Sequence, residues 1–465
     1  MLIRRAELEG GRADLRLRAG RIHEIGADLE RAPGEPSLDA GGGALLPGLH
    51  DHHIHLLSWA AARSSVSCDP RDTRDPTELE AALRGATPRS GWIRAVGYHD
   101  SVAGSLDRWR LDALRGDTPV RVQHRSGALW ILNSAGLASL GLAEDCFPAR
   151  AERDAEGRLT GRLFRLDGWL REQISPTVPP ELAALSRELA ALGVTGVTDA
   201  SAGNGLREHA LFSDAISCGA WRQRLHLLGG DDLGLESGAR VDGGARKILL
   251  DERELPGFES LVGVVRQSHA AGRPVAIHCV TRTELALAAA ALREARPLAG
   301  DRLEHASVAP PDLVERVAEL GLTIVTQPNF LFERGDAYLE EVDGRDHPWL
   351  YRLSGWLDAG VALGGGTDAP FGAADPWRAM RAAVDRKTRA GRCMQAGESL
   401  SPERALALFT TDPARPGGPP RRLAIGAEAD LCLLDRPWCS ARQRLSGCQV
   451  RATWVGGELV WQQGD

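Results

Sequence analysis

The run Pro47-Gly-Leu-His-Asp-His-His-Ile-His55 holds the residues whose types and spacing point most directly to chemistry. If this run forms a strand, its side chains alternate between two faces, so His53 and His55 share one face. Two imidazoles on the same face can bind one divalent cation. Taken alone, the run is also compatible with a surface histidine cluster or with histidines that are satisfied in a core.

Three further potential metal ligands stand at or just after the ends of predicted strands. They are His278 in Ala276-Ile-His278, His305 in Arg302-Leu-Glu-His305, and Asp368 in Gly364-Gly-Gly-Thr-Asp-Ala-Pro370. The carboxyl ends of barrel strands meet at one mouth, where active sites lie, so we expect these side chains to converge. A carboxylate there can bind a cation and accept the proton of an attacking water. Each residue taken singly is also compatible with a structural role.

Lys247 lies in the strand-like run Gly244-Ala-Arg-Lys-Ile-Leu-Leu250. Arg246 and Lys247 must face opposite ways, and we expect Lys247 to be the inward one. An ammonium group is costly to bury in a barrel. Carbamylation by CO2 would turn the side chain into an anion whose two oxygens can bridge two cations. The alternative is a solvated lysine at the edge of a strand.

The elements that must position these residues alternate along the middle of the chain. Helical spacing of Ala and Leu is followed by glycine and a short apolar run, which is typical of a parallel βα array. The predicted helices span 181–192, 259–271, 283–295 and 311–320, and Gly193, Gly272, Gly321 and Gly360 stand where helices should end. We therefore predict an α/β fold whose core is a (β/α)8 TIM barrel.

Both ends of the chain look different from the middle. Short β-like runs separated by glycine occupy 13–25 and 429–461, and Gly456-Gly457 is a hairpin signal. We predict one small β-sandwich domain built from residues 1–46 and 421–465. The barrel would then span 47–420, with a less regular insertion at about 58–180 that we expect to roof the pocket.

Composition narrows the class of protein. The chain has 465 residues, 43% hydrophobic and 26% charged, with a formal net charge of −7. That charge opposes binding to nucleic acid or to an anionic membrane, and no apolar run approaches the roughly 18 residues of a membrane span. The N-terminus has no signal-peptide core, and the eight cysteines form no C-x-x-C pair, so we expect a cytoplasmic protein with reduced thiols.

The ordered series of motifs resembles the amidohydrolase superfamily. Within it, the series is similar to the amidohydrolase-3 branch, which includes N-substituted formamide deformylases and many uncharacterised metal-dependent hydrolases. The matching segments run through nearly the whole chain: 46–55, Asn133-Ser134, 192–199, 302–305, Gln327-Pro328, 367–370, 401–406 and 426–435.

The resemblance implies a ligand set. His53, His55 and Asp368 would bind the more buried metal, His278 and His305 the second, and carbamylated Lys247 would bridge them in a binuclear centre. One or two divalent ions are expected, with zinc foremost, although manganese, iron or cobalt could occupy the same ligands. Asp368 and Lys247 would be the catalytic residues.

The resemblance also implies a reaction. A metal-activated hydroxide would cleave an amide-like or cyclic amide C–N bond, not a peptide bond, of a small molecule, while Asp368 moves the proton to the leaving nitrogen. By the same resemblance, a homodimer is one possible assembly.

The substrate pocket departs from the branch. Ala128 replaces a usual histidine, with His124 nearby, and Thr281-Arg282 replace a usual Gly-Asp. We predict that His124, Arg125 and Arg282 bind substrate and favour a carboxylate or another anionic group. Pairing of these arginines with surface acids is the alternative.

Two other functions stay open from the sequence. A mononuclear deaminase acting on a ring C=N carbon would need the same histidines and aspartate but no bridging lysine. A non-catalytic barrel scaffold would be expected to lose metal ligands, whereas all six positions are filled here.

Overall fold

The computed structural model describes residues 1–174, 181–235, 238 and 240–464. The chain forms two compact units, one made of Met1–His55 with Leu182–Asp465 and the other of Leu56–Glu181. The predicted end of the insertion, at about residue 180, lies outside the described residues. The predicted domain boundaries stay a prediction.

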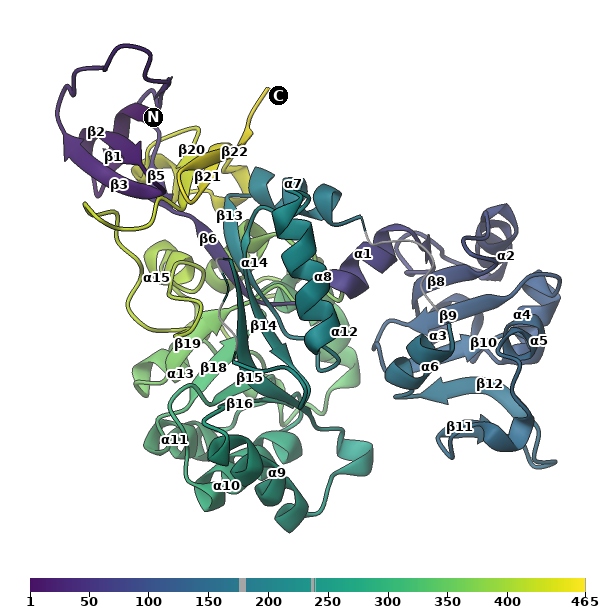
Figure 1. The fold of residues 1–465 in the computed structure, drawn as a ribbon. Helices are drawn as coiled ribbons and strands as arrows, with labels where there is room; N and C mark the ends of the chain where they lie inside the picture. Colours follow the sequence, from purple (N-terminus) through teal and green to yellow (C-terminus); the bar gives the residue numbers. More distant parts are fainter. Residues whose placement is uncertain (175–180, 236–237, 239, 465) are drawn as a thin grey trace. The chain divides into compact units, whose positions relative to one another are not determined.

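A closed parallel barrel forms the centre of the first unit (Figure 1). Its ends meet because the amide of Asp368, just after the last strand, donates to the carbonyl of His53 in the first, over 2.8 Å. The predicted (β/α)8 barrel is confirmed. Among the described residues the eight strands, in sheet order, are β6 (Leu49–Ile54), β13 (Val194–Asp199), β14 (Arg224–Gly229), β15 (Val241–Leu249), β16 (Val275–Cys279), β17 (Arg302–His305), β18 (Thr323–Thr326) and β19 (Ala362–Gly365).

Helices alternate with most of these strands, as the periodicity predicts. Thr281 caps the longest one, its hydroxyl accepting from the amide of Glu284 while the Glu284 carboxylate accepts from the amide of Thr281. The four predicted cap glycines all have positive φ, between 65° and 80°. The helices are α7 (Leu182–Ala191), α8 (Leu206–Ser217), α9 (Phe258–Ala270), α10 (Arg282–Ala295), α11 (Pro311–Glu319), α12 (Asn329–Glu341), α13 (Ser354–Asp358), α14 (Pro376–Asp385) and α15 (Pro402–Ala407).

The barrel interior is unusually polar below its mouth. His50 and His226 face glycines of neighbouring strands, because a Cβ added at Gly196 would lie 2.6 Å from His50 Nδ1 and one at Gly244 would lie 2.2 Å from His226 Nε2. Large rings on some strands thus fill the space left by glycine on others. Strand β14 is not among the predicted strands, because Arg224 and His226 interrupt its apolar pattern.

Both chain termini build the predicted β domain. The N-terminal strands and the C-terminal strands lie side by side in Figure 1, and β5 pairs with β20 across the two ends of the chain. Apolar side chains from both ends, including Ile3, Leu15 and Trp454, fill one shared core. One sheet has the order β3 (Arg21–Gly26), β2 (Gly11–Arg18), β1 (Leu2–Leu8), β4 (Ser37–Asp39), and the other β22 (Glu458–Gln462), β21 (Val450–Val455), β20 (Leu431–Leu434), β5 (Leu45–Pro47).

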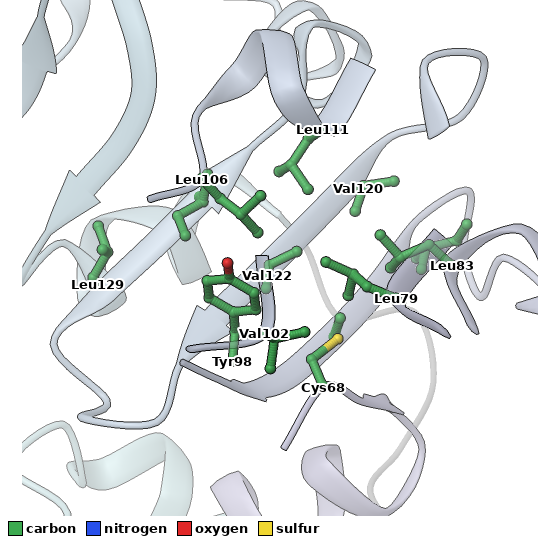
Figure 2. Close-up of a cluster of buried hydrophobic side chains, with 13 residues drawn as sticks. Cys68, Leu79, Leu83, Tyr98, Val102, Leu106, Leu111, Val120, Val122 and Leu129 are labelled. Atoms are coloured by element: carbon green, nitrogen blue, oxygen red, sulfur yellow. The ribbon is translucent and has the colours of Figure 1, made fainter. Parts of the chain in front are cut away.

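The second unit is more regular than the sequence predicts. Its apolar core includes Tyr98, Val122, Leu106 and Leu111 (Figure 2). The core lies against a six-stranded sheet with the order β11 (Ala151–Arg153), β12 (Leu159–Phe164), β10 (Leu129–Leu132), β9 (Val120–His124), β8 (Ile93–Tyr98), β7 (Val66–Ser67). Its longest helices are α1 (Leu56–Arg63), α2 (Pro76–Gly85) and α4 (Arg108–Arg115).

Two further observations concern membrane-spanning helices and the state of the cysteines. Among the described helices, none is both long and apolar enough to pass through a bilayer. All eight cysteines are free thiols.

Candidate metal centre

Three predicted ligands converge at the mouth of the barrel. One ligand atom from each of His53, His55 and Asp368 lies within 4.8 Å of the other two. The Nε2 atoms of His55 and His53 lie 3.1 Å and 3.6 Å from Asp368 Oδ1. His53 and Asp368 are buried and His55 is partly buried. Strand β6 supplies the two histidines and the loop after β19 supplies the carboxylate.

Several buried polar atoms at this site lack a hydrogen-bond partner. They are Nε2 of His53, Oδ1 of Asp368 and Nζ of Lys247. Buried polar atoms are nearly always paired, because an unpaired one costs about 1–3 kcal/mol. A divalent cation between the imidazole nitrogens and the carboxylate oxygen would satisfy the first two atoms. The donor set, two imidazoles and a carboxylate, fits a zinc-like ion.

Each histidine is oriented through its other ring nitrogen. His53 Nδ1 contacts the Glu304 carboxylate, and His55 Nδ1 lies 2.9 Å from the Ser201 hydroxyl. His305 Nδ1 lies 2.7 Å from the amide oxygen of Gln327. With Nδ1 engaged, Nε2 is left to face the site, which is the arrangement of metal-binding histidines.

The two remaining predicted histidines continue the same cluster. The ring of His305 lies 4.7 Å from that of His53 and 4.5 Å from that of His278, measured between centroids. His305 and His278 do not join the compact three-residue set among the described residues. The cluster therefore extends along the mouth from His55 to His278.

Lys247 points into the barrel from β15. It is buried, whereas Arg246 turns outward, donating to Asp231 over 2.9 Å and to Gln267 on α9 over 3.2 Å. Burial lowers the pKa of Lys247, with Glu304 and Asp368 opposing that shift. The lysine is thus held next to the histidine cluster with its ammonium form disfavoured.

The backbone is strained where two of these side chains enter the site. His305 has φ 68° and Asp368 has φ 56°, both in the left-handed region that non-glycine residues rarely adopt. Thr326 donates to the carbonyl of His305 over 2.9 Å. Asp51 accepts from the amide of Thr367 over 3.0 Å. Such conformations persist only where surrounding bonds fix them, and they concentrate at functional sites.

Charges around the cluster favour neutral imidazoles and ionised carboxylates. Burial, with the charge of Lys247, lowers the pKa of His53 to about 3. Burial alone would raise the pKa of Asp368, but His55, His53 and His305 hold it below its usual value. Neutral imidazole and ionised carboxylate are the forms that bind metal.

Glu304 is a site residue that the sequence reasoning missed. It is fully buried and contacts both His53 and Arg302. Arg302 and Glu304 stand two apart on one strand, so an ion pair on the inner face of the barrel was a readable signal. From the motif Arg302-Leu-Glu-His305, only the histidine was predicted to be a site residue.

The three predicted substrate-binding residues each contact a partner that is not one of the converging ligands. Arg282 begins α10 and lies 3.4 Å from Asp346, with a half-exposed side chain. His124 ends β9 in the second unit, where its Nδ1 lies 2.8 Å from the Ser126 hydroxyl. The amide of Arg125, also in the second unit, donates to the carbonyl of Tyr98 over 2.7 Å. Their role in binding substrate stays a prediction.

The comparisons with known proteins agree with this fold. Residues 37–461 match the model of the amidohydrolase family. An N-substituted formamide deformylase from Arthrobacter pascens is 28% identical over 96% of this chain and 94% of that protein. The putative amidohydrolase YtcJ from Bacillus subtilis is 24% identical, covering 93% and 92%. An uncharacterized metal-dependent hydrolase from Pyrococcus horikoshii has the same fold, with a TM-score of 0.75, 21% identity, and 94% and 97% of the chains covered.

Proposed function

This chain belongs to the amidohydrolase family and is an enzyme acting on carbon–nitrogen bonds, and we propose that it hydrolyses an amide-like or cyclic amide bond of a small molecule with the help of a divalent metal. The formamide deformylase from Arthrobacter pascens supports the bond class. It does not carry over the formamide substrate, because the residues around the predicted pocket differ from those of its branch.

One observation carries the proposal: the convergence of His53, His55 and Asp368, with ligand atoms within 4.8 Å of one another. The end of β6 and the loop after β19, far apart in the sequence, bring two imidazoles and one carboxylate together at the mouth of a barrel. This mouth is where barrel enzymes place their catalytic groups.

The protein groups have distinct parts in the proposed reaction. When bound, a divalent cation supplies Lewis-acid chemistry and lowers the pKa of water. Asp368 would accept the proton of the attacking water and return it to the leaving nitrogen, because its neighbours keep the carboxylate ionised at the mouth of the barrel. Glu304 would keep His53 in the tautomer that offers Nε2.

Lys247 supports a second, bridging position. Its neutral amine can add to CO2, forming an N–C bond and releasing one proton, which yields a carbamate anion. A carbamate there would give His278 and His305 a shared anionic partner and make room for a second ion. We propose zinc as the metal, one or two ions per chain, in an enzyme of the cytoplasm.

The test combines metal removal with a hydrolysis screen. Purified protein is assayed with N-acyl amino acids, N-formyl amines, cyclic amides and lactones, before and after chelation and after return of zinc. We expect chelation to abolish turnover and zinc to restore it. Turnover of a good substrate that survives complete chelation would rule out the metal mechanism.

A mononuclear deaminase is the second candidate, favoured by the fact that the compact set contains only three ligands. Lys247→Ala separates the two candidates. The hydrolase with a bridged pair of ions loses one ion and most of its turnover in this variant. The deaminase keeps one ion per chain and its full rate on ring amines.

A further inference from the structure

Arg334 is a cation beside the candidate metal centre that the mechanism does not use. It lies on α12, and its partly buried side chain contacts the loop that follows Asp368. Its Nη2 donates to the carbonyl of Phe371, and its Cζ lies 4.2 Å above the ring of Phe330. Because side chains on a helix lean toward its N-terminus, Arg334 is directed to the end of α12 that adjoins the barrel mouth.

Phe371 connects this guanidinium to the metal centre. Its ring lies 5.6 Å from the ring of His55, edge to face, and its amide donates to the carbonyl of Asp368 over 2.8 Å. The residue that accepts from Arg334 therefore contacts two of the three converging ligands. Asp368 is also among the charges that favour the charged form of Arg334.

Three buried arginines of the first unit have more hydrogen-bond or ion-pair partners than Arg334. Arg302 pairs with Glu304, while Arg273 and Arg386 each donate to four acceptors. Arg334 donates to one carbonyl, and among the described residues no carboxylate lies within ion-pair distance of it. A guanidinium has five N–H donors, so most of its capacity is unused by the protein.

The rings on one side of the guanidinium form a buried apolar cluster, and Phe371, which packs against this cluster, is only partly buried. Phe330 lies edge to face with Tyr351 at 6.0 Å, and the hydroxyls of Tyr351 and Tyr338 lie 3.2 Å apart. The partly buried ring of Phe371 therefore adjoins both His55 and the uncompensated cation, a pairing complementary to a molecule with an apolar body and one anionic group.

We propose that Arg334 is a specificity-determining residue that binds the carboxylate of the substrate while the C–N bond lies at the metal centre. This inference rests on the proposed function and narrows its substrate class to hydrophobic N-acyl amino acids and related acids. The free edge of the guanidinium would hold the carboxylate through two parallel hydrogen bonds. The residues predicted from the sequence to supply the positive charge were His124, Arg125 and Arg282.

A purely structural role for Arg334 is the competing explanation. Glu333, its neighbour on α12, accepts from the amide of Ala373 over 3.2 Å, so α12 clearly holds this loop in place. If Arg334 only holds this loop in place, its loss would weaken the binding of every ligand, charged or neutral. Loss of a carboxylate-binding residue would weaken only the binding of the anion.

The experiment measures binding rather than turnover. Calorimetry gives the affinity of zinc-loaded protein for 3-phenylpropionate and for 3-phenylpropionamide, which differ only in charge, and is repeated after chelation. We expect the carboxylate to bind roughly 10- to 100-fold more tightly than the amide, as a charge-assisted pair implies. Arg334→Gln should abolish this preference, with amide binding unchanged, in both metal states.

Two variants complete the design. Arg389→Gln is the matched control, because Arg389 also lies over a phenylalanine, with its Cζ 5.3 Å from the ring of Phe332, yet its side chain is exposed. It should keep the full preference. Arg334→Lys keeps the charge without the planar fork and should retain only part of the preference, which covers the case in which Arg334→Gln does not fold.

Each remaining outcome overturns the inference. A preference that survives Arg334→Gln but disappears on chelation would assign the carboxylate to the metal, and would leave the proposed function intact. Equal binding of acid and amide by the unaltered protein would point to neutral substrates. Equal loss of both ligands in Arg334→Gln, or a preference that survives Arg334→Gln with and without metal, would show that Arg334 only holds the loop in place.

Discussion

Strand β6 and the residue that follows it carry two pairs of histidines, and the two pairs have different neighbours. His53 and His55 lie at the barrel mouth, with Asp368 and Glu304 as carboxylate neighbours. His50 and His52 lie deeper in the barrel, with ring centroids 4.6 Å apart. Both pairs are enclosed, and they come from six consecutive residues.

The deeper pair is bonded through the other ring nitrogen, Nε2, and Nδ1 of His52 has no hydrogen-bond partner among the described residues. Nε2 of His50 lies 2.9 Å from the Thr198 hydroxyl, and Nε2 of His52 lies 2.9 Å from the Thr411 hydroxyl. Burial lowers the pKa of both rings well below the ordinary value, and the positive charges of Arg302 and Arg421 act in the same direction. A cation there would meet two bonded Nε2 atoms, no carboxylate of the described chain in contact with either ring, and the like charges of Arg302 and Arg421.

The difference teaches that the partner of each ring nitrogen decides what a buried histidine does. At the mouth, one carboxylate, one hydroxyl and one amide oxygen contact the Nδ1 atoms of His53, His55 and His305, and each Nε2 is left to face the site. In the deeper layer, hydroxyls occupy Nε2 itself. Histidine content alone would not distinguish the pairs.

The largest expected effect is on turnover. Asp368→Asn removes the proposed proton carrier and a charged ligand, so turnover should fall by roughly 10²–10⁴-fold. His50→Gln, in the deeper layer, should keep turnover close to that of the unaltered protein. Steady-state rates at matched concentrations of folded protein give both values, and an equal loss in the two variants would erase the distinction between the layers.

Metal-dependent stability is the next largest effect. Zinc at about 100 times its dissociation constant should raise the free energy of unfolding by about 2.7 kcal/mol. His53→Asn should lose this gain, whereas His52→Gln should retain it. Denaturant unfolding with and without zinc measures the difference, and retention of the gain in His53→Asn would place the ion elsewhere.

Glu304→Gln tests how His53 is oriented. Loss of the carboxylate that contacts Nδ1 should weaken metal binding by roughly 10- to 100-fold. Glu398→Gln is the control, because Glu398 accepts from Arg352 over 2.7 Å in a partly buried pair apart from the histidines. Competition with a chromophoric chelator measures both affinities. The orienting role of Glu304 is wrong if the two variants bind zinc equally well.

The smallest effects come from removing one hydroxyl from each layer. Ser201→Ala removes the Nδ1 partner of His55 and should lower metal affinity by about tenfold. Thr198→Val leaves His50 Nε2 buried without a partner, so it should cost about 1–3 kcal/mol of stability with no change in metal affinity. Zinc titration and denaturant unfolding of both variants would show whether the two effects separate in this way.

Much of the fold could be predicted because its signals are local. Helical periodicity and cap glycines place α7, α9, α10 and α11 within two residues of their observed bounds. The hairpin at Gly456-Gly457, with φ 55° and 76°, follows from turn chemistry. The sheet of the second unit was missed although Val120-Arg-Val-Gln-His124 alternates as a strand should and lies between the turn residues Gly116-Asp-Thr-Pro119 and Ser126-Gly127.

The convergence of three ligands was predictable, but the partners that orient them were not. Strand ends at one barrel mouth bring His53, His55 and Asp368 together, which parallel topology requires. The roles of Glu304 and Arg334 depend on what each side chain meets across the barrel, and sequence spacing does not encode those partners. The left-handed backbone at His305 and Asp368 is likewise a product of tertiary bonds.

Anomalous diffraction from zinc-loaded crystals, recorded on both sides of the zinc absorption edge, tests the central claim most directly. We predict a strong zinc peak between Nε2 of His53, Nε2 of His55 and the Asp368 carboxylate. A peak among His50, His52 and His226, or no zinc peak at the barrel mouth, would contradict the account.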